Sequence, residues 1–325
     1  MRERTPSHLL TTYADRLAAA GELRGRGALR EAAEALSSVA GDLSDSPLPD
    51  TAPVHRLRFA AWRDLAEAML MLGAYDEAES ILRTAGEYVA QMLGPDCVEV
   101  AVAANDLGVV HKTVGQPAEA RRMYAEAHRI LAGRDPESYE MATLLHNLAG
   151  LAHSEGRSAE GERDAREAVR LRTALLGAGH IDVAADLANL GALLEAQGKL
   201  DEAEACFDRA LATFETVYGR RHREVAFNLG CLAAIAERRG LHARAEDLYL
   251  EALAIQRSVV GDDHPETMGT LNNLAYLYLV SDRHAKAREA YRTVVALLEP
   301  KVTADHPVLR SARGHLAELT HLGRP

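Results

Sequence analysis

The residues of this chain most able to do chemistry are histidines and carboxylates that interrupt an otherwise regular pattern. His111, His146 and His153 break that pattern, and Asp106 and Glu195 lie on flanking segments at neighbouring heights. Imidazole and carboxylate groups bind metal ions and transfer protons near neutral pH. These five side chains could therefore form a polar pocket that holds a metal ion or performs acid–base chemistry.

Spacing argues against a shared metal ion. His146 and His153 are seven residues apart, which is about 10.5 Å along a helix axis. Zinc needs its donors within about 2.3 Å of one ion, so this pair would need ligands from other helices. No HExxH, Walker-type GxxxxGK[ST] or GxSxG motif occurs. We predict no metal, no cofactor and no catalytic residue, and retain an enzyme with a His/Asp/Glu pocket as the least favoured alternative.

Four other histidines recur at intervals of 42 residues, each just before an expected helix: His180, His222, His264 and His306. Neighbouring helices lie about 10 Å apart, which is too far for such a row to share one ion. We predict that these histidines serve helix starts, where Pro265 and Pro307 occupy a first turn that loses no hydrogen bond.

The elements that position these residues follow from a leucine repeat. Successive members are separated by 42, 41, 42, 42, 42 and 42 residues: Leu65, Leu107, Leu148, Leu190, Leu232, Leu274 and Leu316. Each is followed by Ala or Gly, and five of the first six precede another Gly by eight residues. A period of about 20–50 residues is typical of a solenoid, in which each unit stacks on the last.

Each period contains two expected helices. The segment 183–198 has apolar residues at three- and four-residue spacing and stops at Gly198, and the segment 200–219 repeats the pattern and stops at Gly219. Small residues let paired helices approach closely, and aromatic side chains are expected to fill gaps between units: Tyr124, Phe207, Tyr249 and Tyr291. Strand patterns are absent. The sequence predicts an all-α protein.

The pattern of Asn, Leu and Gly or Ala, followed by Gly, Ala, an aromatic residue and Ala, resembles the tetratricopeptide repeat. The 42-residue length and the G-x-x-H connection in GAGHIDVA, GRRHREVA and GDDHPETM resemble the kinesin-light-chain type of that repeat, as does LNNLAYLY at 271–278. The resemblance covers about residues 57–318. It implies a right-handed α-solenoid of stacked helix-turn-helix repeats.

Three divisions of the chain are expected. Residues 1–56 contain a degenerate first repeat and a Pro-rich loop, residues 57–298 contain five to six 42-residue repeats, and residues 299–325 supply a capping helix. A solenoid needs such polar terminal elements to stay soluble.

The resemblance also implies that the first helix of each unit lines a groove, where a ladder of Asn holds the backbone of an extended peptide. An Asn amide suits this role because it offers both a donor and an acceptor. The ladder positions are the seven residues just before the recurring leucines, and only three of them are Asn: Asn147, Asn189 and Asn273. The expected groove residues are Arg63, Asp64, Glu67, Asn105, Asp106, Lys112, His146, Asn147, His153, Asn189, Glu195, Asn272, Asn273 and Tyr276.

Charge limits the choice of partner. The chain has 37 basic and 48 acidic residues, a net charge of −11, and a pI of about 5.7. Phosphate backbones need clustered Lys and Arg, so we predict no nucleic-acid partner. Because the groove mixes Arg63 and Lys112 with several carboxylates, we expect a neutral to basic protein or peptide partner. The main hypothesis is a scaffold; the second is a receptor for a small ligand or signalling peptide that acts through a partner.

Location follows from the cysteines and from apolar runs. Cys97, Cys206 and Cys231 are odd in number and lack CxxC spacing, which indicates a reducing compartment. Residues 1–21 lack the apolar run of a secretory signal, and no stretch approaches the roughly 20 apolar residues of a membrane helix. We expect a cytoplasmic protein without a membrane partner, and the sequence leaves the oligomeric state open.

Overall fold

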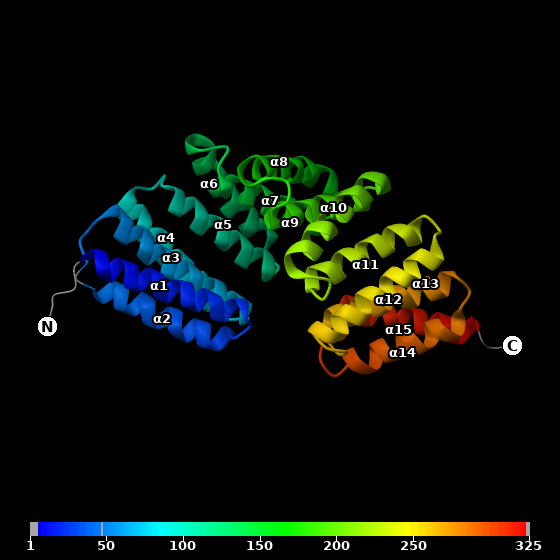
Figure 1. The fold of residues 1–325 in the computed structure, drawn as a ribbon. Coiled ribbons are helices and arrows are strands. Elements are labelled where there is room, and N and C mark those ends of the chain that lie inside the picture. Colours follow the sequence, from blue (N-terminus) through cyan, green and yellow to red (C-terminus); the bar gives the residue numbers. More distant parts are fainter. Residues whose placement is uncertain (1–5, 47, 323–325) are drawn as a thin grey trace. The chain divides into compact units, whose positions relative to one another are not determined.

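The computed structural model describes residues 6–46 and 48–322, and these residues form fifteen α-helices and no strand (Figure 1). The predicted all-α solenoid of stacked helix-turn-helix repeats is confirmed. Parts of the expected terminal divisions, residues 1–5, 47 and 323–325, lie outside the described residues. Contacts divide the chain into two compact units, residues 1–151 and 152–325, and each is described by itself.

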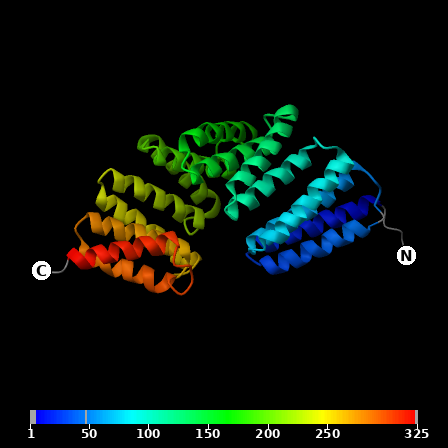
Figure 2. The same ribbon diagram turned by 180° about the vertical axis from the view of Figure 1, so that it is seen from behind.

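Unit 1 consists of antiparallel helix pairs that follow one another along the chain (Figures 1 and 2). Its helices are α1 (Pro6–Gly25), α2 (Leu29–Asp45), α3 (Ala52–Met71), α4 (Tyr75–Leu93), α5 (Val98–Thr113), α6 (Pro117–Arg134) and most of α7 (Tyr139–Ser154). The pairs are α1 with α2, α3 with α4 and α5 with α6. In the pairs α3–α4 and α5–α6, the first helix is the one predicted to carry groove residues.

Unit 2 repeats this arrangement from α8 onward. Its helices are α8 (Ser158–Leu176), α9 (Ile181–Ala196), α10 (Leu200–Tyr218), α11 (Arg223–Arg238), α12 (His242–Val259), α13 (Pro265–Val280), α14 (His284–Leu298) and α15 (Pro307–Leu322). The pairs are α9 with α10, α11 with α12 and α13 with α14, and α15 packs on α14.

The turn inside each pair depends on a residue with positive φ. At the end of α9, Gly198 has φ 78°, and the N–H of Lys199 donates to the carbonyl of Leu194 at 2.9 Å. This bond closes the helix by the Schellman pattern, in which glycine avoids a Cβ clash. The corresponding turn after α13 uses Asp282 at φ 57°, a conformation that Asp adopts more readily than most side chains.

Small residues let the two helices of a pair come close. A Cβ on Gly108 of α5 would lie 2.3 Å from a ring carbon of Tyr124 on α6, and one on Gly191 of α9 would lie 2.9 Å from Phe207 on α10. The sequence interpretation placed these aromatic rings between units, whereas both rings lie against the glycine of their own pair. The rings themselves are fully buried.

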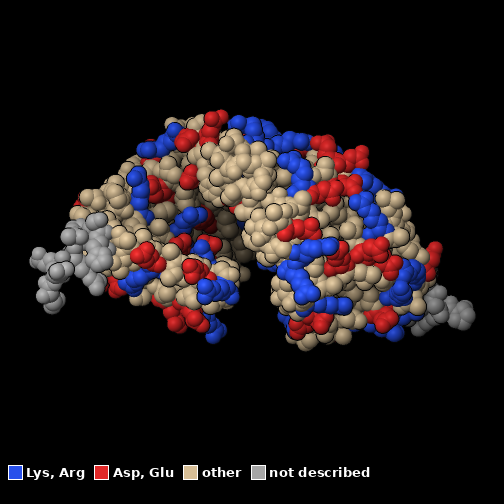
Figure 3. Space-filling view, viewed as in Figure 1, with Lys and Arg blue, Asp and Glu red and all other residues tan. Residues whose placement is uncertain are grey.

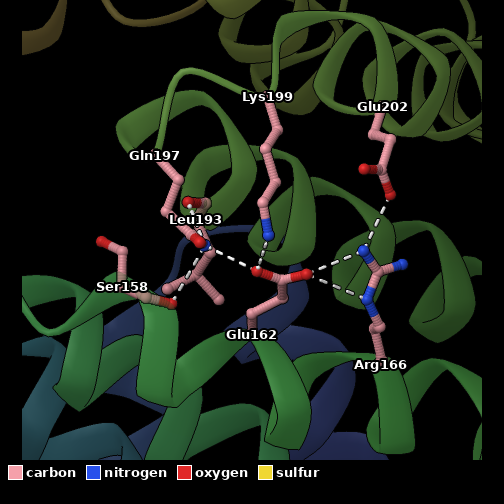
Figure 4. A network of polar contacts seen from close by, with 7 residues as sticks. All are labelled: Ser158, Glu162, Arg166, Leu193, Gln197, Lys199 and Glu202. Carbon is pink, nitrogen blue, oxygen red and sulfur yellow. Dashed lines mark hydrogen bonds and ion pairs between the residues drawn. The ribbon is translucent and has the colours of Figure 1, made fainter.

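A polar network joins α8 to the α9–α10 pair in unit 2 (Figure 4). Glu162 on α8 accepts hydrogen bonds from Lys199 Nζ at 2.7 Å, Gln197 Nε2 at 2.8 Å and Arg166 Nη2 at 2.8 Å. Arg166 also donates to Glu202 on α10 at 2.8 Å. The hydrogen bond from Lys199 is the main cause that lowers the pKa of Glu162 to about 2.

A buried ion pair makes a second link between α8 and the α9–α10 pair. Arg172 on α8 donates to Asp186 on α9 at 2.9 Å, and the two residues are only 5% and 1% exposed. Charges removed from water this completely require each other, because an unpaired buried ion is strongly destabilising.

Candidate partner-binding site

All asparagines of the chain lie on first helices. The six are Asn105 on α5, Asn147 on α7, Asn189 on α9, Asn228 on α11, and Asn272 and Asn273 on α13. Asn228 is fully buried and donates to the carbonyl of Glu224 within its own helix. The remaining five are residues that the sequence placed in the groove.

In unit 1, a chain of hydrogen bonds runs from α3 through α5 to α7. Arg63 Nε donates to Asp106 at 2.6 Å, and Asn105 Nδ2 donates to the other oxygen of Asp106 at 3.1 Å. Asn147 Nδ2 in turn donates to Asn105 Oδ1 at 2.9 Å. Asn105 is buried, and both ends of its amide are used within the protein, so it positions Asn147. Asn147 is half-buried, and its Oδ1 has no hydrogen bond among the described residues.

A cavity of about 320 Å³ lies beside this chain of hydrogen bonds. Its polar lining includes residues predicted from the sequence: Arg63, Glu67, Asn105, Asp106 and Asn147. Its apolar lining comes from Ala66, Leu70, Met71, Leu82, Val109 and Val110. An apolar floor with a few fixed polar groups at its edge is typical of a ligand pocket.

The carboxylates near this cavity are only partly neutralised. Arg24 on α1 pairs with Glu67 at 2.7 Å and lies 3.8 Å from Asp64. Burial raises the pKa of Asp64 and Glu67, although Arg24 opposes the shift. Together with Asp106 there are three carboxylates and two guanidinium groups, those of Arg24 and Arg63, which leaves a local charge of −1.

Two further predicted residues of unit 1 lie on α5 and α7. The Nζ of Lys112 on α5 lies 3.0 Å from the position that a Cβ on Gly150 of α7 would take. Burial lowers the pKa of Lys112, and no carboxylate within the described part of the chain lies within ion-pair distance of it. His146 on α7 is half-buried.

In unit 2, the predicted residues line two cavities on the first helices. A cavity of about 530 Å³ is lined by α9, α11 and α13 and includes Glu195, Asn273 and the half-exposed ring of Phe227. A second, of about 320 Å³, lies among α11, α13 and α15 and includes Asn272, Asn273 and Tyr276. Asn189 is half-buried on α9.

Four of the five side chains that suggested a pocket have separate partners. Nδ1 of the buried His111 lies 2.9 Å from Gln116 Oε1, and Nδ1 of His153 lies 3.3 Å from Ser158 Oγ. Each bond closes the turn of its own helix pair, and Asp106 and Glu195 are engaged with Arg63 and Arg238. In the described residues, no group of three or more His, Cys, Asp or Glu side chains could hold a metal ion. These contacts are those of structural side chains.

The periodic histidines begin helices, as predicted. Nδ1 accepts a hydrogen bond from the backbone N–H two residues later in three cases: His180 from Asp182, His222 from Glu224 and His264 from Glu266, at 3.2, 3.2 and 3.3 Å. An N-cap side chain satisfies a backbone donor that the helix itself leaves unpaired. His306 directly precedes α15.

Charges on the surface of each unit are mixed. Lys and Arg side chains lie next to Asp and Glu over most of the face shown in Figure 3, and many form ion pairs such as Arg129 with Asp96 at 2.9 Å. Across the described residues, no helix is long and apolar enough to cross a bilayer.

Residues 57–132, 140–216, 183–231 and 223–299 match the Tetratricopeptide repeat family model. Since these matches cover most of the chain, the protein belongs to the tetratricopeptide repeat family, a class of repeat scaffold for protein interactions. No curated protein matches the sequence.

Solved structures share this fold at low sequence identity. A Podosopora anserina putative kinesin light chain with nearly identical TPR-like repeats is 21% identical, with TM-score 0.52, over 61% of this chain and 93% of that one. A Pyrococcus horikoshii STAND protein with a tetratricopeptide repeat sensor is 14% identical, with TM-score 0.63, over 100% and 48%. A Rap protein complexed with competence and sporulation factor is 13% identical, with TM-score 0.53, over 96% and 98%.

Proposed function

We propose that this protein is a scaffold that binds an extended peptide segment of a partner protein along its first helices. The observation that carries the proposal is the position of Asn147. Asn105 fixes its amide beside the apolar cavity of unit 1, and its oxygen is left able to accept a hydrogen bond from a peptide N–H. A peptide could place an apolar side chain in the cavity while its backbone meets this amide.

The energies require contacts with several repeats. A neutral hydrogen bond contributes about 0.5–1.5 kcal/mol, and burying one apolar side chain contributes about 1.5–3 kcal/mol. Micromolar affinity corresponds to about 8 kcal/mol. One cavity and one amide are therefore too few, and the proposal includes the groove residues of unit 2: Asn189, Glu195, Asn272, Asn273 and Tyr276.

Charge favours a neutral to basic segment. The cluster around Asp106 has one more carboxylate than it has guanidinium groups, and the whole chain carries −11. Electrostatic attraction of this kind acts mainly on the association rate and weakens as salt is added. The free cysteines Cys97, Cys206 and Cys231 support a cytoplasmic partner.

A receptor for a short signalling peptide is the second candidate. The fold similarity to a Rap protein solved with competence and sporulation factor favours it. A low-molecular-weight extract of the native cells should then raise the melting temperature, and the dialysed extract should not. If the protein is instead a scaffold for a partner protein, neither the low-molecular-weight extract nor its dialysed form should shift the melting temperature.

Photo-crosslinking in the native cells tests the scaffold. A benzoylphenylalanine at Val109, in the lining of the cavity, should crosslink a partner protein. The same group at His128, exposed on the second helix α6, should not. Crosslinks of the same partner from both positions, or from His128 alone, would rule out the proposed face.

A further inference from the structure

The cavity among α11, α13 and α15 contains two hydrogen-bond acceptors that have few donors or none, on Glu237 and Asn272. Glu237 on α11 is half-buried, and within the described residues its one hydrogen bond comes from the hydroxyl of Tyr249 at 3.3 Å. Asn272 on α13 has a buried Oδ1 with no hydrogen-bond partner in the part of the chain that the structure describes. Buried polar groups are normally paired, so the unpaired Asn272 oxygen, beside a carboxylate that has a single donor, indicates a missing donor at this cavity.

The cations that line or adjoin this cavity are already engaged. Arg238 donates to the Glu195 carboxylate at 2.7 Å and to the Glu195 carbonyl at 2.6 Å. His315 on α15 lies 3.2 Å from Glu318. Among the residues that the structure describes, Glu237 has no Lys, Arg or His within ion-pair distance.

Aromatic rings form another part of the lining. The ring of Tyr276 is 41% exposed and lies 5.6 Å from that of His315, centroid to centroid. A cation gains free energy over an aromatic face, and a guanidinium does so while donating hydrogen bonds in its own plane. A carboxylate, an amide oxygen and an aromatic face together complement a basic side chain.

We infer that this cavity binds one basic side chain of the partner segment, arginine in preference to lysine. Glu237 pairs with the cation, Asn272 accepts a further hydrogen bond, and Tyr276 stacks on the guanidinium plane. The inference rests on the proposed function and adds the specificity of one position in the peptide.

The protonation behaviour of Glu237 agrees with this assignment. Burial raises its pKa, because the carboxylate is removed from water without a counter-charge. A bound cation would supply that charge. An isosteric change to glutamine removes an unfavourable buried charge, so Glu237→Gln should fold at least as well as the wild type.

Selection from a displayed library of random 12-residue peptides tests the inference. The wild type should enrich peptides with Arg or Lys at one fixed position. Glu237→Gln should enrich peptides that share the remaining sequence preferences of the wild type but show no preference for Arg or Lys at that position. Glu289→Gln makes the same charge change at an exposed position on the second helix α14 and should behave as the wild type.

A selected peptide, with its arginine replaced by the neutral isostere citrulline, gives the quantitative test by fluorescence polarisation. Citrulline should weaken binding to the wild type about tenfold or more and leave binding to Glu237→Gln nearly unchanged. Selected peptides without a basic position, or equal discrimination by both proteins, would overturn the inference and leave the proposed function standing. A wild type that enriches no peptide would overturn both.

Discussion

The side chain of Asn147 donates a 2.9 Å hydrogen bond to Asn105, which lies 42 residues earlier on the first helix of the preceding pair. The contact therefore spans one repeat. It holds the side-chain amides of two helices in a fixed orientation beside the cavity of unit 1, where the buried Asn105 positions Asn147.

Removing Asn147 should cost stability as well as binding. In Asn147→Ala the side-chain oxygen of Asn105 loses its donor. Because Asn105 is only 6% exposed, this loss should lower the free energy of unfolding by about 1 kcal/mol. Asn273→Ala removes an exposed amide and should change the free energy of unfolding by less than about 0.5 kcal/mol. Urea unfolding of both variants checks this. Equal midpoints for the two would show that the bond between Asn147 and Asn105 contributes nothing.

Gly108 should be irreplaceable by alanine. The added Cβ would overlap the ring of the fully buried Tyr124, and such overpacking costs roughly 1–3 kcal/mol. Gly41 is exposed within α2 and has no atom within 4 Å of a built Cβ. Gly41→Ala should therefore stabilise by about 0.5–1 kcal/mol, through the lower entropy of its unfolded chain. The melting temperature should fall in Gly108→Ala and rise in Gly41→Ala. A shift of both melting temperatures in the same direction would refute the packing argument.

The buried pair of Arg172 and Asp186 should tolerate joint replacement better than single replacement. Asp186→Ala leaves a buried guanidinium without its counter-charge and should cost about 3–5 kcal/mol. Changing both residues to apolar ones, Arg172→Met with Asp186→Leu, removes both charges and should recover most of that loss. Urea midpoints of the single and double variants measure the coupling. A double variant less stable than Asp186→Ala would contradict it.

Glu162 should make the stability of the folded protein depend on pH in the acidic range. Its pKa falls from an ordinary 4.5 to about 2 in the folded protein, so the folded state favours the ionised form. This contribution is complete above about pH 4.5 and is lost as the pH falls toward 2. Glu162→Gln should lower the urea midpoint at pH 7 and reduce its decline between pH 5 and pH 3, whereas Glu289→Gln should not. An unchanged pH profile in Glu162→Gln would exclude this role.

The fold could be predicted because it depends on periodic, short-range features. The glycine eight residues after a recurring leucine ends a first helix with positive φ, as Gly198 does. Three of the four periodic histidines supply an N-cap, as His180 does. Few residue types can occupy these positions, so the helix ends can be recognised directly in the sequence. The exception, Asp282 in place of glycine, still belongs to the small set of residues that accept this conformation.

The site was less predictable because its contacts are made by side chains that do not repeat. Arg24 pairs with Glu67 from a helix outside the matched repeats, and no local pattern connects the two. Asn105 was expected to face a peptide, yet its amide is used inside the protein. His111 and His153 were two of the five candidates for a polar pocket, but each bonds to a side chain across the turn that follows its helix. Exposure and hydrogen-bond partners decide these roles, and both come from the three-dimensional packing.

The affinity of the crosslinked partner segment, made as a synthetic peptide, tests the central claim most directly. Val109→Arg fills the cavity of unit 1 from its lining, and His128→Arg adds the same side chain to the exposed face of α6. Binding of the first helices to the segment predicts that Val109→Arg raises Kd about tenfold or more while His128→Arg keeps the wild-type value. An unchanged Kd for Val109→Arg, in a protein that melts as the wild type does, would contradict the account.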